Sequence, residues 1–289
     1  MGSPAVAVVQ KVFGAETGNF FLLLGTTLFL LVFGLVMVLS SSSIEDGASK
    51  SHDFFSSFAR QGLYALIGVP LMLIASRMPA NFWKRWAWPA VVVTGVLQLA
   101  VFSPIGYTFQ GNRNWIRIGS FTAQPSELVK LALILWISWV VAAKKDLLHD
   151  WKHVLLPIAP VAGVAIGLVL LGKDLGTTII LVAIVFGCLF YAGVRLRFLG
   201  VALLVVSVIA WGFTVSRASR TIRITSWLSG CTSADDFKTS CWQTVHGWWG
   251  IASGGIFGSG LGESKVKWSW LPEAANDFIF AIIGDELGL

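Results

Sequence analysis

Long apolar runs, separated by short polar segments, dominate this chain. A helix needs roughly 20 apolar residues to cross the hydrocarbon core of a bilayer. Seven runs approach that length, and we expect them to be membrane-spanning helices at Phe20–Leu39, Phe58–Ile74, Trp86–Phe102, Pro125–Ala143, Val154–Leu171, Leu175–Val194 and Phe198–Val215. The pattern therefore predicts an all-α fold, a polytopic transmembrane helix bundle.

The last part of the chain departs from this pattern. A long, more polar stretch from Ser216 to Asn276 follows the seventh run, and an apolar run then begins at Phe278 and continues to Leu289. Because that run is too short to span a bilayer, we expect the chain to stop within an eighth helix. We predict a single membrane domain over residues 1–289, truncated at its C-terminus, in which residues 216–276 form a large extracytoplasmic loop.

Composition agrees with a chain whose main solvent is lipid. Of its 289 residues, 55% are hydrophobic and only 12% are charged, whereas soluble proteins carry about 25% charged residues. The net charge of +6 does not indicate nucleic-acid binding, because the basic residues lie in short loops and form no continuous patch.

Lysine and arginine gather in alternate loops, and this distribution predicts how the helices are oriented. We place one set of loops in the cytoplasm because it holds Arg77, Lys84, Arg85, Lys144, Lys145, Lys152, Arg195 and Arg197. The opposite set consists of residues 41–57, residues 105–124, the Lys173–Asp174 corner and the long loop after the seventh run. These segments are expected to face the outside.

The outer loops nevertheless carry positive charge, against the usual bias. These residues are Arg113, Arg117, Arg217, Arg220, Arg223, Lys265 and Lys267. Each by itself is explained by a long side chain that reaches from a helix end to the membrane surface. Two separate basic loops together suggest an anionic ligand at the outer leaflet.

Two helix starts on the outer side carry charged residues. Pro125 suits the first turn of a helix, where its missing N–H has no cost, and Glu127 and Lys130 share a helix face and can pair. Charged groups just inside a membrane helix are costly unless they pair or face a polar cavity. This pair therefore either fixes helix packing or lines a substrate cavity. Asp174 either caps the next helix or faces the same outer cavity.

The long outer loop combines glycine, tryptophan and cysteine. Its Gly-rich stretch, residues 253–262, is not a phosphate-binding P-loop, because the Gly-Lys-Ser/Thr ending is absent. Cys231 and Cys241 lie on the oxidising side of the membrane, which favours a disulfide between them. The nearby tryptophans either form an interfacial aromatic belt or stack on sugar rings: Trp242, Trp248, Trp249, Trp268 and Trp270.

Asp277 stands at the entry to the last apolar run. A carboxylate at this position either caps the following helix or acts as a general base at the boundary between water and lipid. A lipid-linked substrate would present its reactive head group at that boundary. Spacing along the sequence does not choose between the two roles.

These residues belong to motifs by which the chain resembles the shape, elongation, division and sporulation (SEDS) family of peptidoglycan glycosyltransferases, the FtsW and RodA type. The resemblance extends from the first span to the end, and its last motifs are closest to FtsW of the actinobacterial kind. Ala275-Asn276 stands where the family usually has His-Thr or His-Asn, and Lys173 replaces the usual Gln-Pro. The motifs are Asn114-Trp115-Ile116 with Gly119, Gln124–Lys130, Asp174–Thr177, the glycines 254, 255, 258, 260 and 262, Leu271–Ala274, Asp277–Ala281 and Gly284–Gly288.

The resemblance implies a bundle of about ten spans and an enzyme of cell division. Such an enzyme joins units of lipid II, the undecaprenyl-pyrophosphate-linked disaccharide pentapeptide, into glycan strands at the outer face of the bacterial cytoplasmic (inner) membrane. The family's motif places the general base at Asp277, and one base without a covalent intermediate predicts inversion at the anomeric carbon. The resemblance also implies two kinds of partner: a class B penicillin-binding protein and the regulatory proteins of the divisome.

The leaving pyrophosphate is a stable anion that needs neighbouring positive charge rather than a general acid. The outer cations would supply this charge, or a divalent metal ion, Mg²⁺ or Mn²⁺, would; no other cofactor is implied. The candidate substrate-binding residues are Arg113, Arg117, Glu127, Lys130, Asp174, Arg217, Arg223, Lys265, Lys267 and Glu273.

Two other functions compete with this interpretation. A transporter that flips lipid II would need access to both faces of the membrane and no base at Asp277, and no pair of broken helices in matching halves supports it. A non-catalytic scaffold that activates a penicillin-binding protein would tolerate substitution of the outer acids but not of the helix faces.

Overall fold

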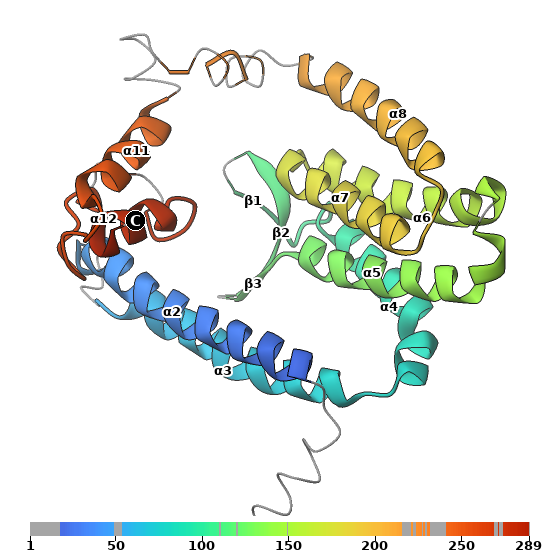
Figure 1. Cartoon of the computed structure of the whole chain (residues 1–289), viewed down its shortest axis with the longest axis horizontal. Helices are drawn as coiled ribbons and strands as arrows, with labels where there is room; N and C mark the ends of the chain where they lie inside the picture. Colours follow the sequence, from blue (N-terminus) through green and yellow to red (C-terminus); the bar gives the residue numbers. More distant parts are fainter. Residues whose placement is uncertain are drawn as a thin grey trace, which may run out of the picture. The chain divides into compact units, whose positions relative to one another are not determined.

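The computed structural model describes residues 18–48, 54–109, 111–119, 121–148, 150–215, 221, 224–226, 228, 230–231, 241–268, 271 and 274–288. Its elements are labelled in Figure 1. The chain divides into two compact units. Unit 1 combines Met1–Ala75 with Arg217–Leu289, and unit 2 is Ser76–Ser216.

Helices occupy all the predicted spans. They are α2 (Gly18–Ala48), α3 (Ser56–Arg77), α4 (Ala80–Ala100), α5 (Pro125–Ala143), α6 (Trp151–Leu171), α7 (Leu175–Tyr191) and α8 (Leu196–Val215). By length and composition, the described residues hold four stretches that can cross a membrane, Gly18–Ser43, Ser56–Arg77, Pro125–Ala143 and Lys152–Leu171, together with shorter apolar helices at Leu175–Tyr191 and Leu196–Gly212. The prediction of an all-α, multi-pass membrane protein is confirmed.

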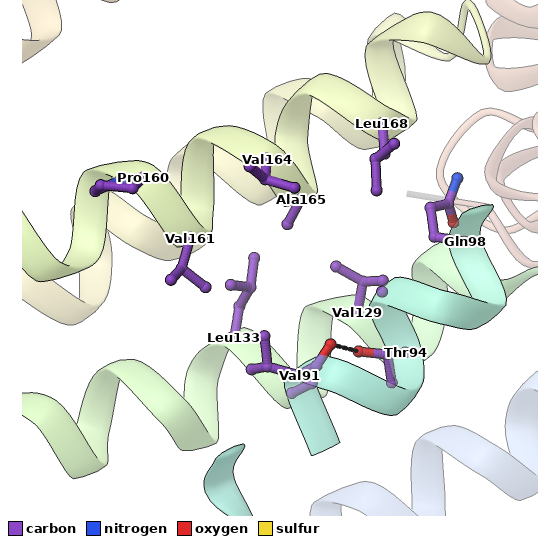
Figure 2. Close-up of a pocket in the computed structure, with 12 residues that line it drawn as sticks. Val91, Thr94, Gln98, Val129, Leu133, Pro160, Val161, Val164, Ala165 and Leu168 are labelled. Carbon is purple, nitrogen blue, oxygen red and sulfur yellow. Dashed lines mark hydrogen bonds between the residues drawn. The ribbon is translucent and has the colours of Figure 1, made fainter. Parts of the chain in front are cut away.

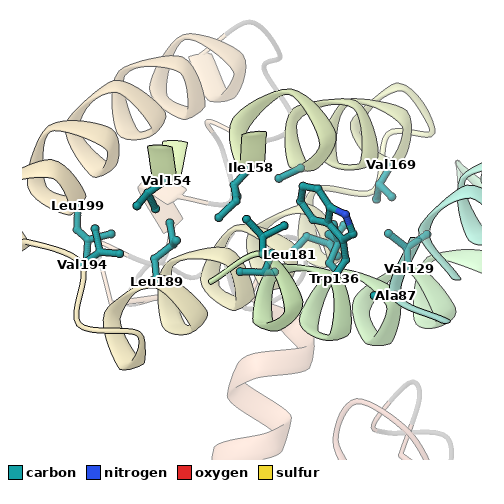
Figure 3. Close-up of a cluster of buried hydrophobic side chains, with 14 residues drawn as sticks. Ala87, Val129, Trp136, Val154, Ile158, Val169, Leu181, Leu189, Val194 and Leu199 are labelled. Carbon is teal, nitrogen blue, oxygen red and sulfur yellow. The ribbon is translucent and has the colours of Figure 1, made fainter. Parts of the chain in front are cut away.

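Helix α5 is the centre of unit 2. Its buried apolar side chains recur at the spacing of one helix face, and Trp136 among them is 1% exposed. The Trp136 ring meets the edge of Trp88 from α4, with ring centroids 5.3 Å apart. Figure 3 shows this core, in which α5 contributes Val129 and Trp136, α6 contributes Val154, Ile158 and Val169, and α7 contributes Leu181 and Leu189.

Helices α4, α5 and α6 also enclose an apolar pocket of about 270 Å³. Pro160 of α6 lies at one end, and Gln98 of α4 and Leu168 of α6 lie at the other (Figure 2). Thr94 contributes a hydroxyl to the lining, but that hydroxyl donates to the carbonyl of Ala90 at 2.8 Å. The pocket therefore presents a mainly aliphatic surface.

The segment of residues 105–124, predicted to be an outer loop, contains a small antiparallel sheet that its sequence pattern does not predict. Its strands are β1 (Gly106–Phe109), β2 (Asn112–Ile118) and β3 (Phe121–Ala123), in the order β1-β2-β3. Gly111 and Gly119 have positive φ angles of 83° and 62° in the two connecting turns. Tight hairpin turns favour glycine because it adopts positive φ without steric strain.

Unit 1 combines segments from the first and the last parts of the described chain. Helices α2 and α3 lie side by side (Figure 1), and α2 continues to Ala48, beyond the predicted end at Leu39. The long loop after α8, predicted to be extracytoplasmic, is not wholly irregular, because α11 (Trp242–Gly254) lies within it. Helix α12 (Ile279–Leu287) packs against α11 and contacts α2.

Glycine sets the distance between α11 and α12. Gly247, Gly250 and Gly254 lie three and four residues apart, so they share one face of α11. A methyl group on Gly247 would touch the ring of Phe278, and one on Gly254 would overlap the backbone of Gly284 and Asp285. Small residues of this kind allow two helices to approach closely, and the contact positions the start of α12.

We expect Gly254→Ala to destabilise the protein by about 1–3 kcal/mol, the usual cost of overpacking, because the added methyl group would overlap the Gly284 carbonyl oxygen. Gly34→Ala is the matched control, since nothing lies within 4 Å of that position in α2. Thermal unfolding of the detergent-solubilised protein measures both. Equal melting temperatures for the two variants would contradict the close packing of α11 on α12.

Candidate active site

A buried ion pair joins three segments of unit 1. The Lys267 ammonium lies 3.0 Å from a Glu286 carboxylate oxygen, and both residues are almost fully buried, with exposed fractions of 3% and 1%. The Ser40 hydroxyl of α2 donates to the two oxygens of that carboxylate at 2.6 and 2.8 Å, and Lys267 also donates to the Ser40 carbonyl at 3.2 Å. The pair therefore connects α2, the loop before α12, and α12 itself.

This environment corrects the role that the sequence suggests for Lys267. The sequence predicts an outer cation that faces an anionic ligand, whereas the structure buries the Lys267 charge against Glu286. A buried charge must be paired because burial removes its water. Lys267 is therefore a structural cation in this arrangement.

The neighbouring acid, Asp285, is also buried and engaged. Ser253 of α11 donates its hydroxyl to the Asp285 carboxylate. Ser259, in the Gly-rich stretch, donates its hydroxyl and its amide to the Asp285 carbonyl oxygen, at 2.9 and 2.8 Å. Gly258, Gly260 and Gly262 follow the chain with positive φ angles of 74°, 106° and 88°. The glycines thus allow the stretch to fold back onto α12.

Asp277 differs from both of these acids. It is exposed, in the turn that leads into α12, and forms no ion pair or hydrogen bond within the part of the chain that the structure describes. The N-cap residue of α12 is Phe278, and no side-chain capping bond is formed there. The alternative in which Asp277 caps α12 is therefore not the arrangement observed.

The charged residues of unit 2 are mostly engaged in structural contacts. Asp174 caps α7, as one alternative predicts, and accepts from the Thr177 amide at 2.9 Å and the Thr177 hydroxyl at 2.7 Å. It also accepts from the Asn114 side-chain amide at 2.6 Å and more weakly from Gln124 at 3.4 Å. Asp174 therefore ties the sheet to the start of α7.

Glu127 and Lys130 form the predicted ion pair at 2.6 Å, with Glu127 half-exposed. The Arg113 guanidinium donates to the carbonyls of Val101, Phe102 and Ser103 at 3.0–3.2 Å, and so it satisfies groups at the C-terminal end of α4. Arg117 is exposed, and its guanidinium lies over the Tyr107 ring, 3.6 Å from the centroid. Whether any of these four residues meets a ligand stays a prediction.

Several sequence predictions concern the long loop. Cys231 and Cys241 are joined by a disulfide, the pairing that their position favours. Lys265 is exposed. Arg217, Arg220, Arg223 and Glu273 lie outside the described residues.

Among the described residues, no group of three or more histidine, cysteine, aspartate or glutamate side chains could hold a metal ion, so we derive no step that uses one.

Several residues that contact these acids are not among the candidate site residues that the sequence predicts. Ser40 stands in a serine run without a distinctive signal, and it meets Glu286 across 246 positions. Ser253 and Asn114 are likewise uncharged residues whose partners are distant in sequence. The Gly284–Gly288 motif contained the relevant acids, but adjacency in the sequence did not show which group each acid would meet.

The fold and the site together define a polytopic helical membrane protein with an exposed carboxylate, Asp277, at the entry to α12, and with buried, engaged acids within that helix. A family model described as cell cycle protein, FtsW/RodA/SpoVE, matches residues 21–289. The chain therefore belongs to the FtsW/RodA/SpoVE family.

Known relatives agree with this assignment. A probable peptidoglycan glycosyltransferase FtsW of Mycobacterium tuberculosis is 36% identical over 99% of this chain and 55% of its own length. The corresponding Geobacter sp. protein is 38% identical over 89% of the chain and 69% of its own length. The chain thus spans about half the length of the mycobacterial relative.

A solved structure shares the fold. It comes from work on structural coordination of polymerization and crosslinking by a peptidoglycan synthase complex. The alignment has a TM-score of 0.63 and 20% sequence identity, and it covers 90% of this chain and 71% of the solved chain. At 20% sequence identity, this similarity is evidence for a shared fold and not for a shared activity.

We expect Lys267→Met to destabilise the protein by about 3–5 kcal/mol, because Glu286 would remain as an unpaired buried charge. The double variant Lys267→Met/Glu286→Gln should recover most of that loss, since no buried charge remains. Thermal unfolding of the unchanged protein, the single variant and the double variant measures these differences in stability.

Lys130→Met is the control for this experiment, because its partner Glu127 is 55% exposed and stays hydrated. We expect it to cost less than about 1 kcal/mol. A Lys267→Met protein as stable as Lys130→Met would show that the Lys267–Glu286 pair is not buried in the native state.

Proposed function

We propose that the protein is a peptidoglycan glycosyltransferase that polymerises lipid II at the outer face of the cytoplasmic membrane during cell division. Family membership and the names of relatives at 36–38% identity support this activity. The observation that carries the proposal is the state of Asp277, a free, exposed carboxylate, while Asp285 and Glu286 are buried and engaged.

Asp277 serves as the general base in this proposal. The reaction joins a sugar hydroxyl of the acceptor to the anomeric carbon of the donor, so the hydroxyl proton must be removed as the new bond forms. A carboxylate that has no other partner can accept that proton. Asp277 lies just before α12, where the apolar run that follows the predicted outer loop begins, and a lipid-linked head group is expected to meet water at such a boundary.

The bond that breaks is the one between the anomeric carbon and the pyrophosphate oxygen. Because pyrophosphate leaves as a stable anion, the site needs positive charge beside it rather than a proton donor. Among the outer cations that the sequence singles out for this role, Lys267 is not available, because it is already paired with Glu286. Direct displacement at the anomeric carbon inverts its configuration.

The proposed partner is a class B penicillin-binding protein. A polymerase supplies linear strands, and a cell wall also requires cross-links, which need a second active site. The solved structure of similar fold is described as part of a complex that coordinates polymerization and crosslinking. Regulatory proteins of the divisome would control this pair during division.

We expect Asp277→Asn to abolish polymerisation, because the amide is similar in size to the carboxylate but cannot accept a proton. The assay uses purified full-length protein with its penicillin-binding partner, lipid II, and moenomycin to suppress unrelated polymerases. Gel analysis of the glycan strands measures the product.

Asp146→Asn is the matched control, since Asp146 is another exposed acid and lies on the predicted cytoplasmic side. It should polymerise like the unchanged protein. Normal strands from Asp277→Asn would remove Asp277 as the base. A folded, unchanged protein that never polymerises in complex with its partner would instead favour lipid transport or a scaffold role.

A further inference from the structure

Unit 1 holds a second feature that the proposed chemistry does not use. A pocket of about 460 Å³ lies where α11, the Gly-rich stretch and α12 meet. Its volume falls within the range of about 300–1,000 Å³ that is typical of small-molecule sites. The polar residues that line it are Ser253, Ser259, Glu263, Lys265 and Asp285, and Trp249 forms part of its wall.

The polar groups that line this pocket mainly accept hydrogen bonds. Ser253 and Ser259 direct their hydroxyl protons to Asp285, so their oxygen lone pairs remain for a ligand. Glu263 adds an exposed carboxylate, and Lys265 adds an ammonium donor. A fitting ligand must therefore be rich in hydrogen-bond donors.

The charge of the pocket argues against an anionic ligand. Asp285 and Glu263 are acids and Lys265 is the single base among the lining residues, so the acids outnumber it. A phosphate or pyrophosphate group would meet the repulsion of like charges here. The pocket is thus distinct in its chemistry from a site for the leaving group.

Trp249 gives the pocket a flat apolar surface in a defined orientation. Trp249 is 54% exposed, and its ring contacts that of His246, with ring centroids 4.8 Å apart. His246 is buried, stacks on Trp242 at 3.9 Å, and contacts the Trp242 carbonyl through Nδ1 at 2.7 Å. Because this stack is held within α11, Trp249 can offer a rigid ring face at small cost in conformational entropy.

We propose that this pocket binds an N-acetylated sugar unit of a glycan strand. A pyranose ring combines an apolar C–H face, which matches Trp249, with hydroxyl and acetamide N–H donors at its edge, which match Asp285 and the two serines. A simple amine would pair with the acids and could meet Trp249 by a cation–π contact, but it has no C–H face to cover the broad ring and fewer hydrogen-bond donors for the two serines. The proposal rests on the proposed function, because that function supplies the glycan.

The test measures binding of chitotetraose, a neutral N-acetylglucosamine tetramer, to the full-length protein by saturation-transfer NMR titration. We expect Trp249→Ala to weaken binding at least tenfold. Trp248→Ala is the matched control, because Trp248 is the preceding residue of α11, is 52% exposed, and is not part of the pocket lining. It should change the dissociation constant less than twofold.

Ser259→Ala provides a second variant, since it removes one acceptor at an exposed position of the pocket. It should weaken binding severalfold, and thermal unfolding would confirm that each variant remains folded. Absence of chitotetraose binding, or equal binding by the Trp248 and Trp249 variants, would overturn the proposal. Trp249-dependent binding of a lysine-containing peptide in place of chitotetraose would overturn it in favour of an amine site.

The binding assay needs no catalysis, so it separates this proposal from the polymerase assignment. Chitotetraose binding that depends on Trp249 supports the sugar site even where the same preparation makes no glycan. Polymerisation without Trp249-dependent binding overturns the sugar site and leaves the polymerase assignment standing.

Discussion

The buried contact between Lys267 and Glu286 is the constraint on which the arrangement of unit 1 depends. Removing two charges from water is expensive, and their attraction offsets that cost only when the geometry is good and the remaining hydrogen-bonding groups are satisfied. Ser40 meets this condition by donating to the Glu286 carboxylate and accepting from Lys267. A displacement of α2, α12 or the loop between α11 and α12 would leave a buried charge without a partner.

Helix geometry directs two consecutive acids of α12 to different partners. Successive residues of an α-helix point about 100° apart, so Asp285 faces Ser253 while Glu286 faces Ser40 and Lys267. The glycine face of α11 then determines how closely α12 can approach. Charge pairing and close packing thus locate α12 together, and Asp277 stands at the entry to that helix.

The charged residues divide into those that hold the structure and those that remain available. Arg113, Asp174 and Glu286 each have identified partners. Asp277, Glu263 and Lys265 are exposed and form no ion pair within the described residues. The proposed sugar transfer needs both kinds of residue, because a base acts well only when fixed groups around it keep it in place.

Much of the fold follows from the sequence by itself. The length and spacing of apolar runs located the helices, since a bilayer imposes a local requirement on each span. Local spacing also predicted that Glu127 and Lys130 can pair and offered the cap as one of two roles for Asp174, and the predicted outer location favoured the Cys231–Cys241 disulfide. The partners in each of these contacts lie within ten positions of each other. Asp277 was singled out by its position before an apolar run and by its motif.

Only the tertiary structure decided which charges are free. Lys267 and Lys265 stand two residues apart in the loop between α11 and α12, and no local pattern separates them, yet one is buried against Glu286 and the other is exposed. Ser40 lies 227 positions from Lys267 and 246 from Glu286. The sequence likewise did not predict the hairpins of residues 106–123 or the ring stack of Trp242 and His246 behind Trp249. Hydropathy indicates which segments suit a membrane, whereas the partner of a buried charge depends on contacts that form only when distant segments pack together.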